Sequence, residues 1–426
     1  MKTNVLVVIF GLLYLPISAQ ALTLTEVVDA VRATHPRIEE ARQNAEGARS
    51  RIHTESWLPD PEAGVMFEEA PTGLGLRQAD MTTYSVSQSV PFPTKIATKA
   101  KSLSHDHKAK TAMATEIERR VVFEAKKTFY ELVAARNALS DKTNIVHYYQ
   151  QAISGLSKAY ETNLTSPIDA ESMMQNRAGE TVNGGIFDDI LILKMKKAEA
   201  DTEIHDLRHA EKALSAKLNL MMGRDVEVKL GRLDLPNVKA LKAGVEELEE
   251  KLLKQNADLT ALLWLVKKSE KDVSLARQNL LPTLIPEVEY NQRQNNANAY
   301  SLGLKFNVPL WFTRNASEIK SAKAESLRRR AEYDSAKLDV RAELHNLVNY
   351  AKWHYQILGK YRGEILPLAR SLVNRALASQ TANLTVSSST SQKLIGYHQA
   401  STMYWEMWKN YQIEYAMLEE LIGEDL

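Results

Sequence analysis

The sequence contains no cysteine. Disulfides, thiol catalysis, thiolate metal sites and the lipidated cysteine of a bacterial lipoprotein are therefore not expected. Glycine and proline are also scarce, with 17 and 13 residues among 426, and this shortage of helix breakers favours long helices over many short elements. The 54 basic residues balance 53 acidic ones, so no net charge would attract nucleic acid.

Long apolar runs are confined to the N-terminus. Met1 and Lys2 precede the apolar run Val5–Leu15, and Ala19-Gln20-Ala21 follows as a small-x-small cleavage site. These features predict a secretory signal peptide over residues 1–21. Elsewhere no stretch reaches the roughly 20 apolar residues that a membrane-spanning helix needs. If the mature chain enters a membrane, we expect it to do so with strands.

Two pairs of segments alternate between apolar and polar residues, as strands with one apolar face do. We expect strands at 62–68 and 81–90, and again at 287–292 and 299–308. Strands of about nine to eleven residues can cross an outer membrane when tilted, although a hairpin packed on a soluble core gives the same pattern. The residues expected to face lipid are Tyr84, Val86, Val90, Val288, Tyr290, Tyr300, Leu302, Leu304, Phe306 and Val308.

Short motifs around these strands recur, which indicates an internal duplication. The offset between the copies is 218 residues at the first motif, 220 at the second and 200 at the third, so roughly twenty extra residues lie in the first copy before its last motif. The recurring motifs are Val90-Pro91-Phe92 with Val308-Pro309-Leu310, Asn163-Leu164-Thr165 with Asn383-Leu384-Thr385, and the endings at Gly223 and Gly423.

The chain is therefore divided into the signal peptide, a first repeat (22–223), a connector (224–243) and a second repeat (244–426). In the first repeat we expect helices at 24–57, 95–163 and 188–222, with a tip and an irregular insertion at 163–187. In the second we expect helices at 245–280, 314–381 and 387–422, with a tip at 382–387. A continuous helix over 95–163 would extend on the order of 100 Å, too long to lie inside a globular domain.

Strands can span a bilayer only as a closed barrel, because an open sheet edge leaves backbone groups unpaired in lipid. Four strands cannot close one, since the smallest bacterial barrels have about eight. Several copies must then share one barrel, which continues into water as a helical tube. The predicted fold is mainly α with a β-barrel part, and its shape is that of a conduit.

The order of these elements, with Leu-Pro breaks at Leu58-Pro59 and Leu281-Pro282, resembles the TolC-type outer-membrane factor (outer-membrane efflux protein) family over residues 22–426. The resemblance implies a homotrimer with a twelve-stranded barrel in the Gram-negative outer membrane and a helical tube in the periplasm. Its implied partners are outer-membrane lipid, a periplasmic adaptor (membrane fusion protein) and an inner-membrane pump, as in RND-type tripartite efflux. The compact hairpin over 62–90 resembles the heavy-metal cation branch, and export of drugs or of polypeptides by type I secretion is the alternative within the family.

The family also implies functional positions at the helix tips. Adaptor contacts are expected at Asn163, Leu164, Thr165 and Ser166 and at Asn383, Leu384 and Thr385. Acidic side chains often narrow the entrance of such a tube, but no Asp or Glu occurs from Ser371 to Leu394. Asp169, Asp188 and Asp189 near the first tip are the substitutes.

Nothing in the sequence indicates catalysis, a bound cofactor or a metal site. It lacks a phosphate-binding glycine loop and the HExxH motif, and His205 and His209 lack further ligands nearby, although a cation site needs three or four. We therefore expect no enzyme. A function of another class, that of a non-conducting periplasmic coiled-coil adaptor or spacer, remains open if the hairpins are soluble.

Overall fold

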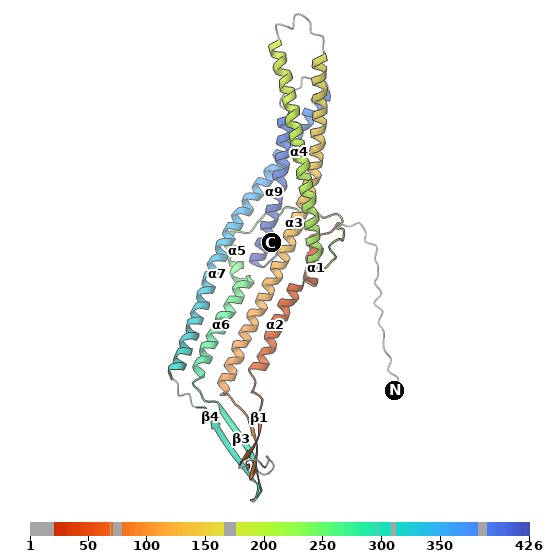
Figure 1. The fold of residues 1–426 in the computed structure, drawn as a ribbon. Helices are drawn as coiled ribbons and strands as arrows, with labels where there is room; N and C mark the ends of the chain where they lie inside the picture. The colour runs from red at the N-terminus through yellow and green to blue at the C-terminus, as the bar shows by residue number, and fades with distance from the viewer. Residues whose placement is uncertain are drawn as a thin grey trace, which may run out of the picture. The chain divides into compact units, whose positions relative to one another are not determined.

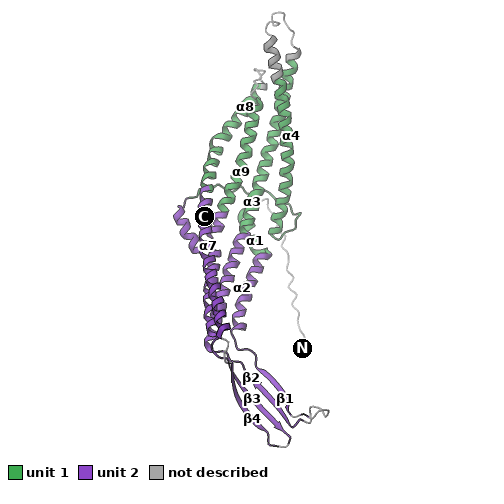
Figure 2. Ribbon diagram, turned by 60° about the vertical axis from the view of Figure 1, so that its left-hand side comes forward, with its two compact units in different colours: residues 1–35, 122–241, 350–416 green, residues 36–121, 242–349, 417–426 purple. Residues whose placement is uncertain are grey.

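The computed structural model of the protein describes residues 21–68, 70, 79–165, 176–294, 296–307, 312–381 and 390–426. They form two compact units, coloured separately in Figure 2. The first unit comprises the described residues of 1–35, 122–241 and 350–416, and the second those of 36–121, 242–349 and 417–426. The fold is mainly helical, with long antiparallel helices and two β-hairpins, as the sequence predicted.

The two repeats follow the same order of elements. The first runs α1 (Leu24–Thr34), α2 (Pro36–Glu55), β1 (Glu62–Glu68), β2 (Met81–Ser87), α3 (Pro93–Thr165) and α4 (Asn176–Met221). The second runs α5 (Val245–Gln255), α6 (Ala257–Gln278), β3 (Leu284–Arg293), β4 (Ala299–Phe306), α7 (Phe312–Lys360), the π turn η3 (Tyr361–Ile365), α8 (Leu366–Thr381) and α9 (Thr390–Ile422).

In the second unit, side chains of α3 form hydrogen bonds with side chains of both α2 and α6. Side-chain bonds to α2 include Arg42 with Glu118 at 3.3 Å, and those to α6 include Ser102 with Asp272 at 2.5 Å. The side of α2 that is buried consists largely of alanine, which allows neighbouring helices to approach closely. The sheet lies at the end of these helices (Figure 1). The buried residues of α2 are Ile38, Ala41, Ala45 and Ala48.

In the first unit, four helices share one apolar core. Ile145, Tyr149 and Leu156 of α3 pack with Leu193 of α4 and with residues of α8 and α9. Further along α9, the aromatic residues Trp408 and Tyr411 are also buried, both at most 2 % exposed. The Tyr411 hydroxyl donates to the carbonyl of Lys239, which fixes the connector between the repeats against α9.

Both repeats have a break that the predicted continuous helices over 24–57 and 245–280 did not include. His35 is extended (φ −74°, ψ 121°) between α1 and α2, because the ring of Pro36 disfavours a helical conformation in the residue before it. Asn256 has nearly the same conformation between α5 and α6. There the Asn256 side chain caps α6 by accepting from the amide of Leu259 at 2.8 Å.

The predicted helix over 314–381 is also interrupted, by the π turn at Tyr361–Ile365. Pro367 follows in α8 and has no amide proton for the carbonyl of Gly363, so the helix widens at this point. Conversely, the backbone from Asn176 to Phe187, predicted to be irregular, is helical and belongs to α4. Ile186, Ile190 and Leu193 are buried at helical spacing, and this packing outweighs the helix-weakening glycines.

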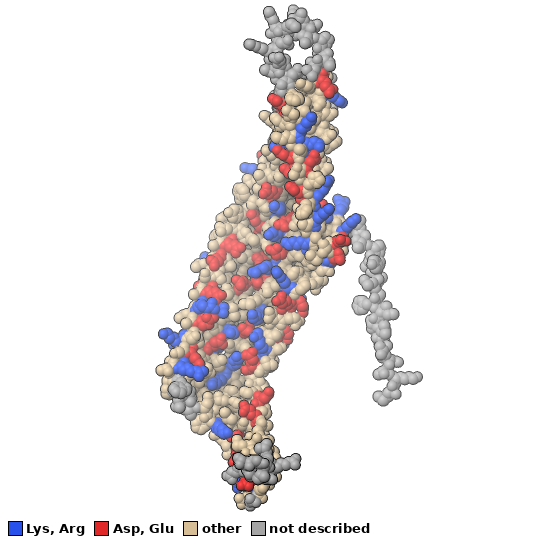
Figure 3. Space-filling model, in the orientation of Figure 1, with Lys and Arg blue, Asp and Glu red and all other residues tan. Residues whose placement is uncertain are grey.

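Charged side chains of both signs alternate along the helices. Figure 3 shows no large patch of one sign on the face drawn. Many oppositely charged side chains lie one helical turn apart. Lys254 Nζ, for example, is 2.6 Å from Glu250 Oε1. Such exposed pairs contribute little, because water screens their charges, so we attribute the stability of the helices mainly to their buried faces.

Each repeat ends with a glycine in a left-handed conformation, Gly223 at φ 69° and Gly423 at φ 89°. We expect Gly223→Ala to lower the free energy of unfolding by about 1–2 kcal/mol, because an L side chain is strained at positive φ. A Cβ atom would also lie 3.0 Å from the Cβ of Thr34. Thermal unfolding followed by circular dichroism measures the change.

The matched control for this glycine is Gly396→Ala in α9, where an added Cβ meets nothing within 4 Å. Alanine there should stabilise the helix by up to about 1 kcal/mol. If the two substitutions shift the melting temperature in the same direction, the conformational requirement at Gly223 is refuted.

Candidate functional site

The four strands form one antiparallel sheet in the order β1-β2-β3-β4. Paired residues on neighbouring strands point to the same side, so the register assembles rows of side chains. Tyr84 pairs with Tyr290, and Tyr290 with Tyr300. The next row joins Val86, Val288 and Leu302. The register therefore gathers the predicted lipid-facing residues on one face.

This apolar face is open to solvent in the single chain. Leu302 is 84 % exposed and Tyr300 78 %, while Leu304 and Phe306 are each 61 % exposed. Tyr290 is only half-buried, and Val90 lies beyond the end of β2, where it makes an isolated bridge to Leu284. An apolar patch of this kind marks a surface that another molecule or a membrane covers. Val308, also predicted here, lies outside the described residues.

The first strand contributes residues that the sequence reading did not name. Ala63 pairs with Val86 and Val65 with Tyr84, so these β1 residues and Phe67 lie on the apolar face. Val65 is 55 % exposed and Phe67 41 %. The signal was present as the alternation of Ala63, Val65 and Phe67, but Met66 on the opposite side obscured it.

The opposite face of the sheet is polar and internally bonded. The Thr83 hydroxyl donates to Asn291 Oδ1 at 2.8 Å, and Asn291 Nδ2 donates to the hydroxyl of Ser301 at 2.9 Å. On the same face, the Lys305 ammonium forms an ion pair with the Glu287 carboxylate at 2.5 Å. These bonds cross three strands, so the sheet has one apolar face and one polar, hydrogen-bonded face.

Both outer strands of the sheet have an unpaired edge. Neither β1 nor β4 has a second strand neighbour among the described residues. Free edges are sites where further strands pair, and in lipid their amide and carbonyl groups have no water to bind. The sheet therefore cannot enter a bilayer while these two edges stay unpaired.

The tip residues are only partly within the described structure. Asn163, Leu164 and Thr165 form the last turn of α3, whereas Ser166, Asp169 and the second tip, Asn383, Leu384 and Thr385, lie outside the described residues. Of the acidic candidates, Asp188 is exposed. Asp189 is only 6 % exposed and accepts a hydrogen bond from Ser391 at 2.6 Å. The Asp189 carboxylate therefore joins α4 to α9 and is not presented to solvent in the protomer, because it lies on the helix face that packs.

A buried polar cluster, which sequence reading missed, joins α3, α4 and α9. The Lys142 side chain is 5 % exposed and donates to Glu203, to His398 and, at 2.7 Å, to the hydroxyl of Thr402. His398 also lies 3.0 Å from Glu203 and 3.0 Å from the Tyr149 hydroxyl. Three helices are thus bonded at one level through a single ammonium group.

The protonation of this cluster follows from its burial. Burial lowers the pKa of His398, the charge of Lys142 lowers it further, and the opposing effect of Glu203 is smaller. Burial alone would raise the pKa of Glu203, but the hydrogen bond from Lys142, together with the effects of the Lys142 charge and the adjacent His398, outweighs this, and the net shift is downward. We conclude that the Glu203 carboxylate is ionised and the His398 imidazole neutral at neutral pH.

The cluster predicts that acid destabilises the first unit. Because the pKa of His398 in the folded protein is below its ordinary value of 6.5, the unfolded chain binds this proton at higher pH than the folded chain does. The free energy of unfolding should therefore fall as the pH drops below about 6.5, and the dependence should level off below the folded pKa. Denaturant unfolding at several pH values measures it.

Substitution of His398 by glutamine should flatten this pH dependence, whereas His205→Gln, at an exposed position of α4, should leave it unchanged. Equal slopes in both variants and the unaltered protein would assign the acid sensitivity to other groups.

Two classes of feature are absent from the part of the chain that the structure describes. None of its helices is long and apolar enough to cross a membrane. No group of three or more His, Asp or Glu side chains in it could hold a metal ion.

Comparisons with known proteins agree with the geometry of the sheet and helices. Residues 248–358 match the family described as outer membrane efflux protein. No protein of curated function has a sequence that matches this one. The family consists of transport channels, in agreement with the prediction that the chain is not an enzyme.

Solved structures of outer-membrane channels share the fold over almost the whole chain. OprN superposes with a TM-score of 0.76 at 13 % identity, over 94 % of this chain and 89 % of its own. VceC from Vibrio cholerae has a TM-score of 0.74 at 14 % identity, over 94 % and 96 %. CusC has a TM-score of 0.74 at 10 % identity, over 94 % and 92 %. These identities show the fold and do not separate its branches. The chain therefore has the fold of the outer-membrane efflux channels, and residues 248–358 carry the sequence pattern of the outer membrane efflux protein family.

Proposed function

We propose that this protein is the outer-membrane channel of a tripartite efflux system, a passive duct formed by three copies of the chain. The observation that carries the proposal is the two-faced sheet with two open edges. Its apolar face, with Leu302 and Tyr300 more than three quarters exposed, suits lipid, and its bonded polar face suits a water-filled lumen.

A homotrimer would resolve the edge problem. Three sheets of four strands give twelve, which is within the range of bacterial barrels, and β4 of one copy would pair with β1 of the next. Export of the chain by the N-terminal segment 1–21 as a signal peptide fits this location. The helices would extend into the periplasm, with the tips after Asn163 and around Asn383 in contact with an adaptor.

Energy for transport would come from the partners. The proposed partners are an inner-membrane pump of the RND or a similar type and the periplasmic adaptor that links it to the tips. Asp169 and Asp188 remain the proposed acidic residues at the entrance, since Asp189 is bonded to Ser391.

The charge of the polar sheet face supports cations as the cargo. By register, it carries four carboxylates, Glu62, Glu68, Glu287 and Glu289, against the two cations Arg293 and Lys305. Three copies around one axis would multiply this excess and attract cations into the lumen. We propose heavy-metal cations as the cargo, with drugs or secreted polypeptides as the alternatives.

The testing experiment is conductance across a planar bilayer by the purified mature protein, with its oligomeric mass measured in the same detergent. The proposal predicts a trimer that forms cation-selective channels. Glu289→Gln should reduce the selectivity, whereas Glu364→Gln, at an exposed position of η3, should not. A protein that is soluble without detergent and never conducts would instead be a periplasmic spacer.

The cargo is tested separately in cells that lack their own efflux channel. Expression of this chain with its pump and adaptor should raise the tolerated concentration of metal salts more than that of drugs. Protection against drugs alone would support the proposed duct but would identify drugs, and not metal cations, as its cargo.

A further inference from the structure

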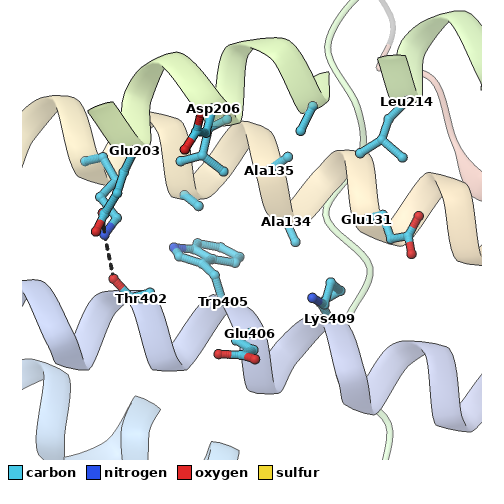
Figure 4. A pocket seen from close by; sticks show the side chains of 14 residues that line it. Glu131, Ala134, Ala135, Glu203, Asp206, Leu214, Thr402, Trp405, Glu406 and Lys409 are labelled. Atoms are coloured by element: carbon cyan, nitrogen blue, oxygen red, sulfur yellow. Dashed lines mark hydrogen bonds and ion pairs between the residues drawn. The ribbon is translucent and has the colours of Figure 1, made fainter. Parts of the chain in front are cut away.

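A cavity of about 510 Å³ lies within the first unit between α3, α4 and α9, and the proposed duct makes no use of it (Figure 4). Its volume is within the range of small-molecule sites. Alanine side chains end at Cβ, so the facing helices leave a hollow between them. Its apolar wall consists of Ala134, Ala135, Ala138, Leu207, Ala210 and Leu214.

One aromatic ring projects into this hollow in a fixed orientation. Figure 4 shows Trp405 extending from α9 toward α3 and α4. Its Nε1 donates to Asp141 Oδ2 at 2.8 Å, and the Ser401 hydroxyl donates to the same oxygen at 2.9 Å. With its only donor bonded within the protein, the indole offers a ligand its aromatic surface, which attracts both apolar rings and cations.

The lining of the cavity is rich in uncompensated negative charge. Glu131, Asp206 and Glu406 line it, and none of these three has a hydrogen bond or an ion pair to the part of the chain that the structure describes. Of the two lysines in the lining, Lys142 is already paired with Glu203, which leaves Lys409 to oppose three carboxylates. A concave site lined by one sign of charge concentrates ligands of the opposite sign.

We propose that this cavity is a binding site for an aromatic organic cation. The ligand's ring would stack on Trp405, its apolar body would contact the alanine and leucine wall, and its positive charge would lie among the carboxylates of the lining, such as Asp206. Alternatives with one of these features alone fit less well: an inorganic cation does not use the apolar wall, and an aromatic anion is repelled by the carboxylates. The inference needs only the fold of the first unit and does not depend on conduction.

Ethidium, a planar aromatic cation, is a suitable probe. Its binding to the purified full-length protein is measured by fluorescence anisotropy in detergent, with an aromatic anion, 8-anilinonaphthalene-1-sulfonate, as the competitor. We expect saturable binding of ethidium that the anion does not displace. Trp405→Leu should weaken it by about tenfold, and the double change Asp206→Asn with Glu406→Gln by about fivefold, less at high salt.

Two matched pairs distinguish this site from general adsorption. Ala138→Leu fills the cavity and should abolish saturable binding, whereas Ala198→Leu, at an exposed position of α4, should not. Glu364→Gln removes one carboxylate outside the cavity and should change the affinity by less than twofold. Oligomeric mass and melting temperature show whether each variant is folded. If Trp405→Leu does not fold, the single change Glu406→Gln, at an exposed position, still tests the site.

The proposal is overturned if Ala138→Leu and Glu406→Gln both leave ethidium affinity within twofold of the unaltered protein, or if the anion competes with comparable affinity. Because binding and bilayer conductance are separate readouts, loss of one leaves the other interpretable. A conducting trimer without the ethidium site would refute only this inference.

Discussion

Leu304→Arg is expected to abolish assembly of the protein in the outer membrane. Leu304 lies on the apolar face of β4 and is 61 % exposed, so in a barrel its side chain would contact lipid. An arginine near the middle of a bilayer costs about 2–4 kcal/mol on the lipid face of such a barrel, and a trimer would contain it three times. That total is comparable to the whole stability of an ordinary domain. Membrane fractionation and trimer yield measure the loss.

The matched control is Ser301→Arg, on the polar face of the same strand. Ser301 accepts a hydrogen bond from Asn291, so this change removes one bond but places the charge on the face assigned to the lumen. We expect normal insertion, altered ion selectivity and a small loss of stability. Equal insertion of the two arginine variants would show that the two faces of the sheet are wrongly assigned.

The faces of the sheet could be predicted because strand side chains alternate with a period of two. Once Tyr300, Leu302 and Leu304 were placed on one face, the pairing of β3 with β4 had few solutions, and the observed register joins Tyr300 to Tyr290 and Leu302 to Val288. Element ends were predicted less well. Val90 lies beyond β2 because the ladder is interrupted before it: Gln88 faces Pro286, which has no amide to donate, although Val90 still exchanges backbone hydrogen bonds with Leu284.

The helix interruptions and the buried polar contacts could not be predicted from the apolar periodicity of the sequence, for two different reasons. Pro36 was a local signal for the break at His35, but Asn256 has no proline after it, and its break depends on capping α6 and on a bond from its side chain to the carbonyl of Leu421. Lys142 and Glu203 are 61 residues apart, and Glu203 and His398 are 195 apart. From the sequence alone, each of these three residues looks like an ordinary surface residue. The apolar periodicity indicates which face of a helix is apolar, but it does not indicate which polar residues come into contact.

Lys142→Met is expected to lower the free energy of unfolding by about 2–3 kcal/mol. Methionine retains the apolar stem, so the loss reports the ammonium group and its bonds to α4 and α9. Breaking a fully buried ion pair costs about 3–5 kcal/mol. The loss expected for Lys142→Met is smaller because the Glu203 side chain is 43 % exposed and its charge is partly screened by water. Denaturant unfolding measures the change, and Lys197→Met, which breaks an exposed pair with Asp201, should cost about 0.3–0.5 kcal/mol.

The same substitution should also alter the response to acid, which separates an electrostatic role of Lys142 from a packing role. The charge of Lys142 is the second cause of the lowered pKa of His398, after burial, and Glu203 opposes both. Without that charge the pKa of His398 rises toward the value of the unfolded chain, so fewer protons are taken up on unfolding and the loss of stability below pH 6.5 becomes shallower. A protonated His398 could then donate to Glu203 in place of the lysine. If Lys142→Met destabilised the protein with an unchanged pH slope, the lysine would act through its packing alone.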